Sequence, residues 1–202
     1  KELVAKTFPS LVYRDRQAVA ELAASSHAEK ILELGCSSGP FTQALSKTFP
    51  DADIWACDIS QRQLEQAQRV GNEQGYNWNL FQAKAEETHQ DTSRFDLVAS
   101  YAMFHELPVD ISKEVMSETF RVLKPGGMFV MGDVKSYAVM DDYGAWTADL
   151  WNNQRGYDPF WRDYATTDFG SVALDIGFEN VEWRGINESQ HPFVLTAYKP
   201  KA

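Results

Sequence analysis

Two short stretches place acidic, glycine and small polar residues directly after apolar runs. The first, Glu33-Leu-Gly-Cys-Ser-Ser-Gly39, follows Ile31 and Leu32 and leads into a helical pattern. A glycine turn between a strand and a helix places backbone N–H groups around a small polar ligand. The second is Asp58, about twenty residues beyond the turn, where a carboxylate can hold both hydroxyls of a ribose. Together these stretches predict a site for a ligand that contains a nucleoside.

Two other interpretations of this glycine loop (residues 33–39) stay open. Gly35 and Gly39 allow the backbone to pass close to a ligand, but a strand-to-helix turn without any ligand has the same local sequence. NAD is the nearest rival ligand because it uses the same architecture. The loop does not give the spacing G-x-G-x-x-G, however, and this disfavours NAD.

The candidate catalytic residues, His105, Asp133 and Tyr101, lie at or just beyond the ends of two expected strands. His105 can act as a general base near neutral pH, although a role in fixing the turn is favoured. Asp133 is either a base or a turn former. No group of His, Cys and carboxylate residues has metal-ligand spacing, so no metal is predicted. Cys36 and Cys57 are expected to be buried apolar residues rather than a disulfide.

Residues 134–166 contain eight aromatic side chains among polar residues and turn formers, with little helical period. Core packing would explain them, because Trp and Tyr often simply bury surface. We favour a lid or pocket wall, because an insertion after the fifth strand can cover the edge of the sheet. Its aromatic rings could hold a planar or cationic substrate. The substrate-binding candidates in this aromatic segment are Trp146, Trp151, Tyr157, Phe160, Trp161 and Tyr164.

Strand and helix patterns alternate along most of the chain. Helices are expected at 11–24, 41–49, 60–75, 111–124 and 168–176, and strands at 30–34, 53–57, 78–82, 95–100, 128–132, 179–186 and 193–198. This alternation predicts an α/β fold with a parallel sheet wound on both faces. Only residues 187–192 separate the last two strands, which is too short for a crossover, so these strands should pair antiparallel.

Composition limits the classes of partner. The 202 residues suit a single domain (1–202), with an N-terminal helical segment (1–28) and the aromatic insertion (134–166). A net charge of −10 argues against nucleic acid or an anionic membrane as a partner. No apolar run approaches membrane-spanning length, and we expect a reducing cytoplasm. Because the chain starts at Lys1 without a methionine, a domain of a larger synthase is one expectation, and a homodimer is another.

Taken in order, these motifs resemble the class I S-adenosylmethionine (SAM)-dependent methyltransferases, and in particular the small-molecule methyltransferases of bacteria. The resemblance covers nearly everything from Ile31 to Pro200. It implies a Rossmann-like, doubly wound sheet of seven strands in the order 3-2-1-4-5-7-6, mostly parallel with the last strand antiparallel. The motifs that carry it are the glycine loop, Asp58, Phe95-Asp-Leu-Val98, His105-Glu-Leu-Pro108 and Arg121-Val-Leu-Lys-Pro-Gly-Gly127.

The resemblance also implies SAM as the cofactor, with S-adenosylhomocysteine as the product. Glu33 would meet the cationic amino group of the methionine part, Asp58 the ribose, and Ile59 the adenine face. The adenine edge would lie beside the Ala85 backbone and Glu86. The implied cofactor-binding residues are Glu33, Gly35, Cys36, Ser37, Gly39, Asp58, Ile59, Ala85, Glu86, Ser100 and Tyr101.

The chain departs from the family pattern at Ser37, where a third glycine is usual, and at Lys84, where an acidic residue is frequent. The implied function is transfer of a methyl group from SAM to an O, N or C atom of a small-molecule acceptor, in secondary metabolism. A SAM-fold enzyme with a non-methylating reaction is one alternative. A domain that binds SAM or a partner without catalysis is the other.

Overall fold

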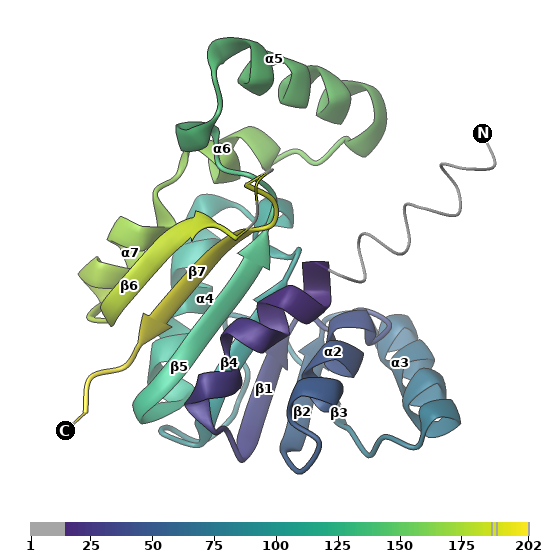
Figure 1. The fold of residues 1–202 in the computed structure, drawn as a ribbon. Helices are drawn as coiled ribbons and strands as arrows, with labels where there is room; N and C mark the ends of the chain where they lie inside the picture. The colour runs from purple at the N-terminus through teal and green to yellow at the C-terminus, as the bar shows by residue number, and fades with distance from the viewer. Residues whose placement is uncertain (1–14, 187, 189, 202) are drawn as a thin grey trace.

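A single seven-stranded sheet organises the part of the chain that the computed structural model describes, residues 15–186, 188 and 190–201 (Figure 1). The strand order is β3-β2-β1-β4-β5-β7-β6, and β7 runs antiparallel to both of its neighbours. Both features confirm the predicted topology. The strands are β1 Lys30–Leu34, β2 Asp53–Asp58, β3 Asn79–Gln82, β4 Phe95–Tyr101, β5 Leu123–Asp133, β6 Glu179–Gly185 and β7 Phe193–Tyr198.

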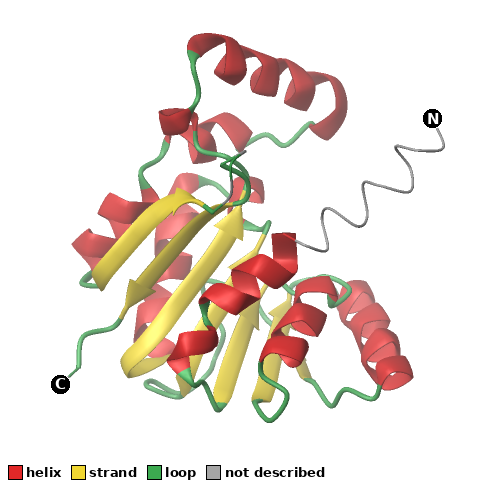
Figure 2. Cartoon of the chain, in the orientation of Figure 1, coloured by secondary structure: helices red, strands yellow, loops and turns green. Residues whose placement is uncertain are grey.

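Helices cover both faces of this sheet (Figure 2). The predicted N-terminal helix lies partly outside the described residues, and it is seen as a helix over residues 15–22. The longer helices are α2 Pro40–Thr48, α3 Gln61–Gln74, α4 Val109–Val122, α5 Asp142–Trp151, α6 Trp161–Thr166 and α7 Phe169–Ile176. Short helical turns are η1 Ala24–Ser26, η2 Phe104–Glu106, η3 Tyr137–Val139 and the π-helical η4 Asn152–Gly156.

The central strands are buried on both faces, as parallel strands between two helical layers must be. Along β1, Ile31 packs in the same apolar cluster as Phe41 of α2 and the helix at 15–22. Leu32 and Leu34 point to the other face, where their cluster includes Val115 of α4. A slip of one residue would exchange the two faces, so burial fixes the register of β1 in the sheet.

Local capping signals place the ends of two helices correctly. Ser60 begins α3, and its hydroxyl accepts a hydrogen bond from the Gln63 backbone N–H (3.4 Å). Gly75 ends α3 with φ of +78°. Asp168 begins α7 and accepts from the Ser171 N–H (3.2 Å), and Gly177 ends α7. These four positions agree with the predicted helix boundaries.

The junction after α4 differs from its predicted position. We expected the helix to run to residue 124 and the next strand to begin at Met128, but α4 ends at Val122 and β5 begins at Leu123. The Lys-Pro-Gly-Gly stretch belongs to β5 but is irregular, because Gly126 has φ of +80° and the pairing with β4 shifts register here. The Gly126 N–H donates to the Lys199 carbonyl (2.8 Å), which ties this stretch to the C-terminal segment.

The aromatic segment is largely helical, which corrects the expectation of little regular structure there. It contains η3, α5, η4 and α6, and it lies beyond the carboxyl end of β5 (Figure 1). Asp141 begins α5 and accepts a hydrogen bond from the Gly144 N–H (2.7 Å). No residue of α5 is buried, and its apolar side chains Tyr143, Trp146 and Leu150, which recur at helical spacing, are exposed.

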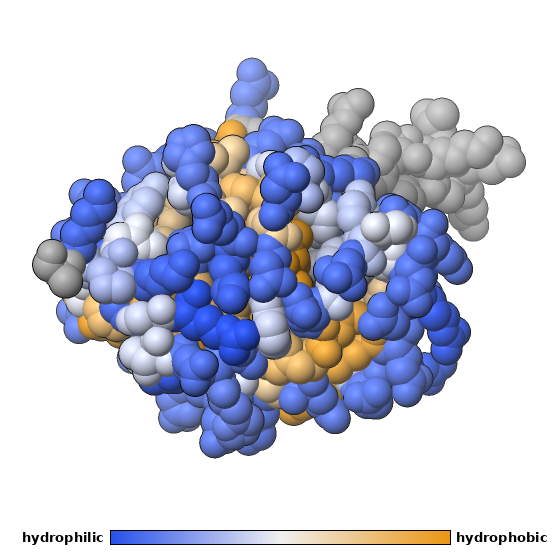
Figure 3. Space-filling view, turned by 90° about the horizontal axis from the view of Figure 1, so that it is seen from below, coloured by the Kyte–Doolittle hydropathy of each residue, from blue (hydrophilic) through white to orange (hydrophobic). Residues whose placement is uncertain are grey.

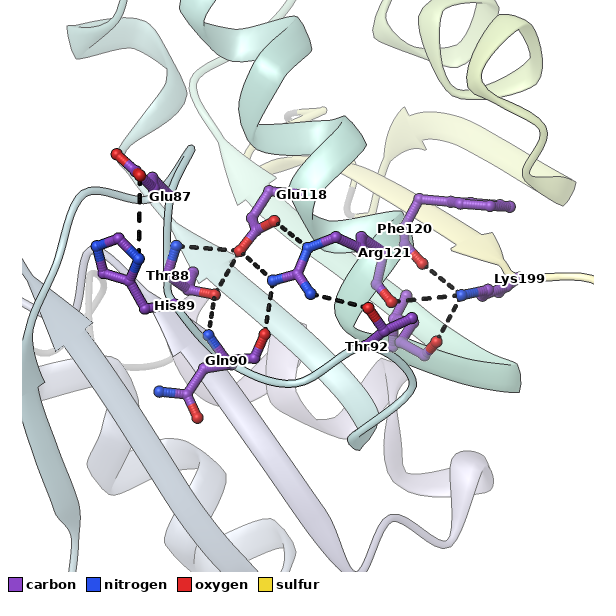
Figure 4. Close-up of polar contacts among 10 residues, drawn as sticks. Glu87, Thr88, His89, Gln90, Thr92, Glu118, Phe120, Arg121 and Lys199 are labelled. Carbon is purple, nitrogen blue, oxygen red and sulfur yellow. Dashed lines mark hydrogen bonds and ion pairs between the residues drawn. The ribbon is translucent and has the colours of Figure 1, made fainter.

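A polar network fixes the loop between β3 and β4 against α4 (Figure 4). Glu118 accepts hydrogen bonds from the Thr88 N–H (3.0 Å) and hydroxyl (2.5 Å). Arg121 donates to the Glu118 carboxylate (2.7 Å) and to the Gln90 carbonyl oxygen (2.7 Å). Because this loop also carries Ala85, the network holds one wall of the candidate site in place.

The glycine loop adopts a left-handed backbone at three positions. Gly35 has φ of +69°, Ser37 +49° and Gly39 +87°. This conformation costs a non-glycine residue about 1–2 kcal/mol, which explains why a glycine is usual at Ser37. A Cβ added at Gly39 would lie 2.8 Å from the Trp78 ring. Both backbone conformation and space therefore require glycine at residue 39.

Gly39→Ala should lower the free energy of unfolding by about 2 kcal/mol or more, because it combines a strained backbone with overpacking against Trp78. Gly75→Ala is the matched control: its φ is similarly positive, but nothing lies within 4 Å of the added Cβ. We expect this control to cost only about 1 kcal/mol. Urea denaturation measures both values. Equal losses would show that contact with Trp78 contributes nothing.

Candidate cofactor and active site

The carboxyl ends of the parallel strands align at one edge of the sheet. Leu34 at the end of β1 pairs with Cys57 of β2 and with Ser100 of β4, and Tyr101 pairs with Gly132 of β5. Open α/β sheets bind ligands at this edge, where the strand order reverses between β1 and β4. The opposite edge, seen from below in Figure 3, is covered largely by hydrophilic side chains. Gly35 follows β1 at this edge, and Asp58 and Asp133 are the last residues of β2 and β5.

A cavity of about 390 Å³ opens at this edge and brings together five of the predicted cofactor residues. Its lining is mostly apolar, as expected for a site that holds a flat ring system. Ile59 is the most exposed part, with 67% of its surface accessible. The lining residues are Gly35, Asp58, Ile59, Ala83, Lys84, Ala85, Glu86, Met103, Glu106, Leu107, Pro108 and Ile111.

Sequence analysis missed the apolar floor of this edge cavity. Met103, Leu107 and Ile111 come from the turn after β4 and the start of α4, and none was among the predicted site residues. Met103 lies so close to Gly35 that a Cβ added there would be 2.5 Å from its Sδ atom. Most residues of the stretch 101–111 are apolar, so the sequence did not single out these three.

Asp58 joins the glycine loop to the start of α3. One carboxylate oxygen accepts a hydrogen bond from the Ser37 N–H (2.8 Å), and the other accepts from the Ser60 N–H (2.8 Å). Each oxygen retains a further lone pair that can accept a hydroxyl. Asp58 therefore holds the loop in its strained conformation and faces the edge cavity at the same time.

Glu33 is a buried carboxylate with an oxygen that has no partner. Only 1% of Glu33 is exposed, and its Oε2 makes no hydrogen bond within the described residues. Burial raises the pKa of Glu33 to about 8, although the Thr42 hydroxyl and the Arg16 guanidinium offset part of this rise. An unpaired buried carboxylate is costly unless a cation meets it. The buried Ser100 hydroxyl also lacks a partner among these residues.

Cys36 and Cys57 are buried free thiols, as predicted. The Cys36 side chain packs with Ala56 and Leu64, away from solvent. Only the backbone of Cys36 can therefore contribute to the expected cofactor site. Burial raises the pKa of both thiols, for Cys57 to about 12. Both remain protonated at neutral pH and are inert as nucleophiles.

His105 and Asp133 form a buried pair across the ends of two strands. Asp133 accepts hydrogen bonds from the Phe104 N–H (2.8 Å) and the Val134 N–H (2.7 Å). His105 Nδ1 lies 2.5 Å from its carboxylate. Burial alone would lower the pKa of His105, but Asp133, with smaller contributions from Glu106 and Asp158, raises it above its ordinary value. With Nδ1 on Asp133, Nε2 of His105 lies 3.5 Å from the Glu106 carboxylate.

Tyr101 lies between the helix at 15–22 and α2. Its ring is 5.4 Å from the Phe41 ring, and the Arg16 guanidinium lies 5.1 Å from its centre. Burial raises the pKa of Tyr101 to about 12, so its hydroxyl stays protonated at neutral pH. Within the predicted catalytic set, Tyr101 can therefore donate a hydrogen bond but cannot serve as a base.

The aromatic segment places its predicted substrate residues in different environments. Trp161 contacts His105, with ring centres 5.9 Å apart, and its Nε1 donates to the Tyr137 hydroxyl (3.0 Å). Tyr164 is completely buried beneath His105 and belongs to the core, so it offers no surface to an acceptor. Phe160 is half-buried at the start of α6. Trp146, Trp151 and Tyr157 are at least half exposed.

One further group was not visible in the sequence. A ligand atom each from His105, Glu106 and Asp158 lies within 4.8 Å of the others. Asp158 is distant in the sequence, so residue spacing could not reveal this group. The three residues could hold a cation. This arrangement does not test the prediction that the protein binds no metal.

Comparison with known proteins shows the fold and a family match over part of the chain. Residues 31–127, just under half of the chain, match a family described as "Methyltransferase domain". A putative O-methyltransferase from Nostoc punctiforme superposes with a TM-score of 0.74 at 20% identity, covering 97% of this chain and 59% of that one. A putative sarcosine dimethylglycine methyltransferase from Galdieria sulphuraria gives 0.66 at 16% identity, covering 93% and 86%.

Several curated relatives are named as methyltransferases. The mitochondrial 2-methoxy-6-polyprenyl-1,4-benzoquinol methylase of Gallus gallus is 25% identical over 170 residues, covering 74% of this chain and 53% of the relative. A malonyl-[acyl-carrier protein] O-methyltransferase of Paenibacillus is 34% identical over 104 residues, covering 50% and 37%. The chain spans about half the length of the curated relatives it matches. No helix within the described residues is long and apolar enough to cross a membrane.

Glu33→Gln should change how stability depends on pH. Between the ordinary pKa of 4.5 and the folded value of about 8, folded Glu33 keeps a proton that the unfolded chain loses. The free energy of unfolding therefore falls as pH rises through this range. Gln removes this term, so the variant should gain on the order of 2 kcal/mol or more over the parent between about pH 5 and pH 8. Urea denaturation at each pH, with Glu65→Gln as an exposed control, measures it. A pH-independent difference would contradict the assignment.

Asp133→Asn should lower the pKa of His105. The substitution removes the charge that holds the imidazolium, whereas burial, which favours the neutral ring, remains. NMR titration gives the pKa, with the His105 signal assigned by its absence in His105→Gln. Asp158→Asn, which removes a weaker contribution, should lower the pKa less. If Asp133→Asn leaves the pKa unchanged, the pair does not control His105.

Proposed function

We propose that this chain moves a methyl group from SAM to a small molecule, because residues 31–127 match a methyltransferase domain family and the fold matches that of solved methyltransferases. One observation carries the proposal most strongly. The unpaired buried carboxylate of Glu33 and the carboxylate of Asp58 flank the glycine loop beside an apolar cavity. This arrangement matches a ligand with a cationic end, a ribose and a flat ring.

The residues present fit SAM. Glu33, with its unpaired oxygen, would hold the methionine ammonium, and the lone pairs of Asp58 that remain would accept the ribose hydroxyls. Ile59, Met103 and Leu107 would enclose the adenine. Lys84 forms an ion pair with Glu86 (3.7 Å). The family often has an acidic residue at the position of Lys84, and in this chain Glu86 supplies the carboxylate at the same wall of the cavity.

SAM supplies a methyl group that is already activated by a sulfonium, so the protein mainly aligns the acceptor and excludes water. His105 would take a proton from the acceptor through Nε2 when the acceptor is protonated at working pH. Asp133 would keep the imidazole in the required orientation through its bond to Nδ1. In this role Asp133 is a positioning residue, because its carboxylate already contacts the Phe104 N–H, the Val134 N–H and His105 Nδ1.

The acceptor would lie between His105 and the aromatic segment. Trp161 already contacts the His105 ring, and α5 and α6 stand over this edge of the sheet (Figure 1). Aromatic walls favour an acceptor with a planar or cationic part. We propose an O, N or C atom of a small molecule of secondary metabolism as the methylated atom. A non-methylating SAM enzyme and a non-catalytic SAM-binding domain are the alternatives that the experiment separates.

Isothermal titration of the chain with SAM and with S-adenosylhomocysteine tests the cofactor. Both should bind, and Asp58→Asn should weaken both about 10- to 100-fold through lost charge-assisted hydrogen bonds. Asp53→Asn is the matched control, because Asp53 occupies the opposite end of the same strand. Failure of the parent chain to bind either compound at millimolar concentration would refute the proposal.

Incubation with methyl-labelled SAM and a small-molecule extract then tests catalysis. We expect label in an extract component and stoichiometric S-adenosylhomocysteine, with the rate rising as pH passes the pKa of His105. His105→Gln should bind SAM normally and transfer the label slowly. Cofactor binding without any transfer would favour the non-catalytic alternative, and cleavage of SAM without methylation would favour the non-methylating one.

A further inference from the structure

Two carboxylates lie beside the imidazole of His105, in addition to that of Asp133. The Glu106 carboxylate is 3.5 Å from Nε2 of His105. A carboxylate oxygen of Asp158 lies within 4.8 Å of the ligand atoms of both His105 and Glu106. Burial lowers the pKa of His105, and the charges of Asp133, Glu106 and Asp158 together raise it above its ordinary value. The negative charge of both additional carboxylates therefore reaches the nitrogen that would accept a proton from the acceptor.

The protein does not neutralise these two carboxylates. Within residues 15–186, 188 and 190–201, no lysine or arginine forms an ion pair with Glu106 or Asp158. Arg162 lines the same cavity as Asp158, but it is paired with Asp149. The Glu106 side chain is 55% exposed, so a ligand can reach it. Carboxylates at this separation repel each other, and a cation between them removes that repulsion.

Asp158 is held in this position by a buried amide. Nδ2 of Asn152 donates to the Asp158 carbonyl oxygen (3.0 Å), and Oδ1 of Asn152 accepts from the Asp158 N–H (3.1 Å). Only 8% of Asn152 is exposed. The protein therefore fixes an unpaired carboxylate beside other negative charges, at a cost in stability. Positions that cost stability in this way are typical of binding sites.

The surroundings of this charged group suit a small molecule with a positive charge. A cavity of about 330 Å³ among α5, η4 and α6 is lined by Asp158 and Tyr157. The Trp161 ring contacts the His105 ring (5.9 Å between centres), and the Trp151 ring lies 6.0 Å from that of Trp161. Indole rings attract cations through their faces. Room, aromatic rings and negative charge thus occur together at one place.

The sign of the charge distinguishes between the possible acceptor atoms. An oxygen or carbon acceptor commonly reacts as an anion, such as a phenolate, a carboxylate or an enolate. Two fixed carboxylates beside the base would repel such an anion. An alkyl amine instead arrives as an ammonium ion, and its nitrogen is again positively charged after it has gained a methyl group. Negative charge at this place therefore favours a nitrogen acceptor.

We propose that the acceptor is a primary or secondary amine that binds as its ammonium ion, and that Glu106 and Asp158 select it. This inference rests on the proposed function and narrows its acceptor atom to nitrogen. The ammonium gives one proton to Nε2 of His105. The lone pair that this frees forms the N–C bond while the C–S bond of SAM breaks and leaves its electron pair on sulfur. The products are a methylammonium ion, neutral S-adenosylhomocysteine and an imidazolium at His105.

The chemical class of the labelled product tests the inference first. The parent chain is incubated with methyl-labelled SAM and a small-molecule extract, and the products are passed over a cation exchanger at neutral pH. We expect the exchanger to retain the label and mass spectrometry to place it on nitrogen. Label on an oxygen or carbon atom would overturn the inference while leaving the proposed function intact. Absence of any transfer would refute the proposed function instead, so the two failures are distinguishable.

Glu106→Gln and Asp158→Asn test the two selecting residues. The measurement is made above the pKa of His105 and below that of alkyl amines, so that titration of the imidazole does not contribute. At limiting extract, each variant should transfer label to the retained amine about tenfold more slowly, and at saturating extract the loss should be smaller. SAM affinity, measured by isothermal titration, should stay within about twofold, which also shows that the variants fold. Asp163→Asn, an exposed carboxylate of the same segment, should keep the parent rate.

Three results with these variants would contradict the assignment. Unchanged rates at limiting extract would mean that neither carboxylate contacts the acceptor. A loss only at saturating extract would mean that the carboxylates act on the chemical step rather than on binding. Loss of activity with EDTA, restored by Mg²⁺, Mn²⁺ or Zn²⁺, would mean that His105, Glu106 and Asp158 hold a metal ion instead. We expect EDTA to leave the rate unchanged.

Discussion

The hydrogen bond from the Ser37 N–H to the Asp58 carboxylate is the interaction on which the site depends. It joins a strained loop after β1 to the end of β2, and the second oxygen of Asp58 caps the entry to α3 through Ser60. Without this tie, the left-handed backbone at Ser37 would lose its compensation. The same carboxylate borders the edge cavity, so loop geometry and ligand contact are set by one group.

Two buried carboxylates at the same sheet edge differ in how many of their hydrogen-bond partners the protein supplies. Asp133 is satisfied by two backbone N–H groups and by His105, which suits a group that only orients another. Glu33 retains an oxygen without a partner and a raised pKa. Satisfied buried groups stabilise a fold, whereas unsatisfied ones cost free energy that a ligand can recover. This contrast separates the structural carboxylate from the one that we propose to bind the cofactor.

The aromatic segment is built differently from the sheet that supports it. No residue of α5 is buried, and polar contacts hold it, including bonds from Tyr137 and Arg162 to the Asp149 carboxylate. Elements with little buried apolar surface open at a lower free energy than the core. A cover of this kind can admit an acceptor while the cofactor side stays rigid.

The sequence by itself determined the antiparallel pairing of the last two strands and the caps at Ser60 and Gly177, because these follow from local spacing, whereas the sheet order followed from the resemblance to a known family. It also placed Asp58 at the correct edge. Only the tertiary structure decided that Met103 floors the cavity and that Asp158 lies beside His105, because these contacts join distant segments. The structure also decided that the apolar side chains of α5, Tyr143, Trp146 and Leu150, stay exposed although they recur at helical spacing.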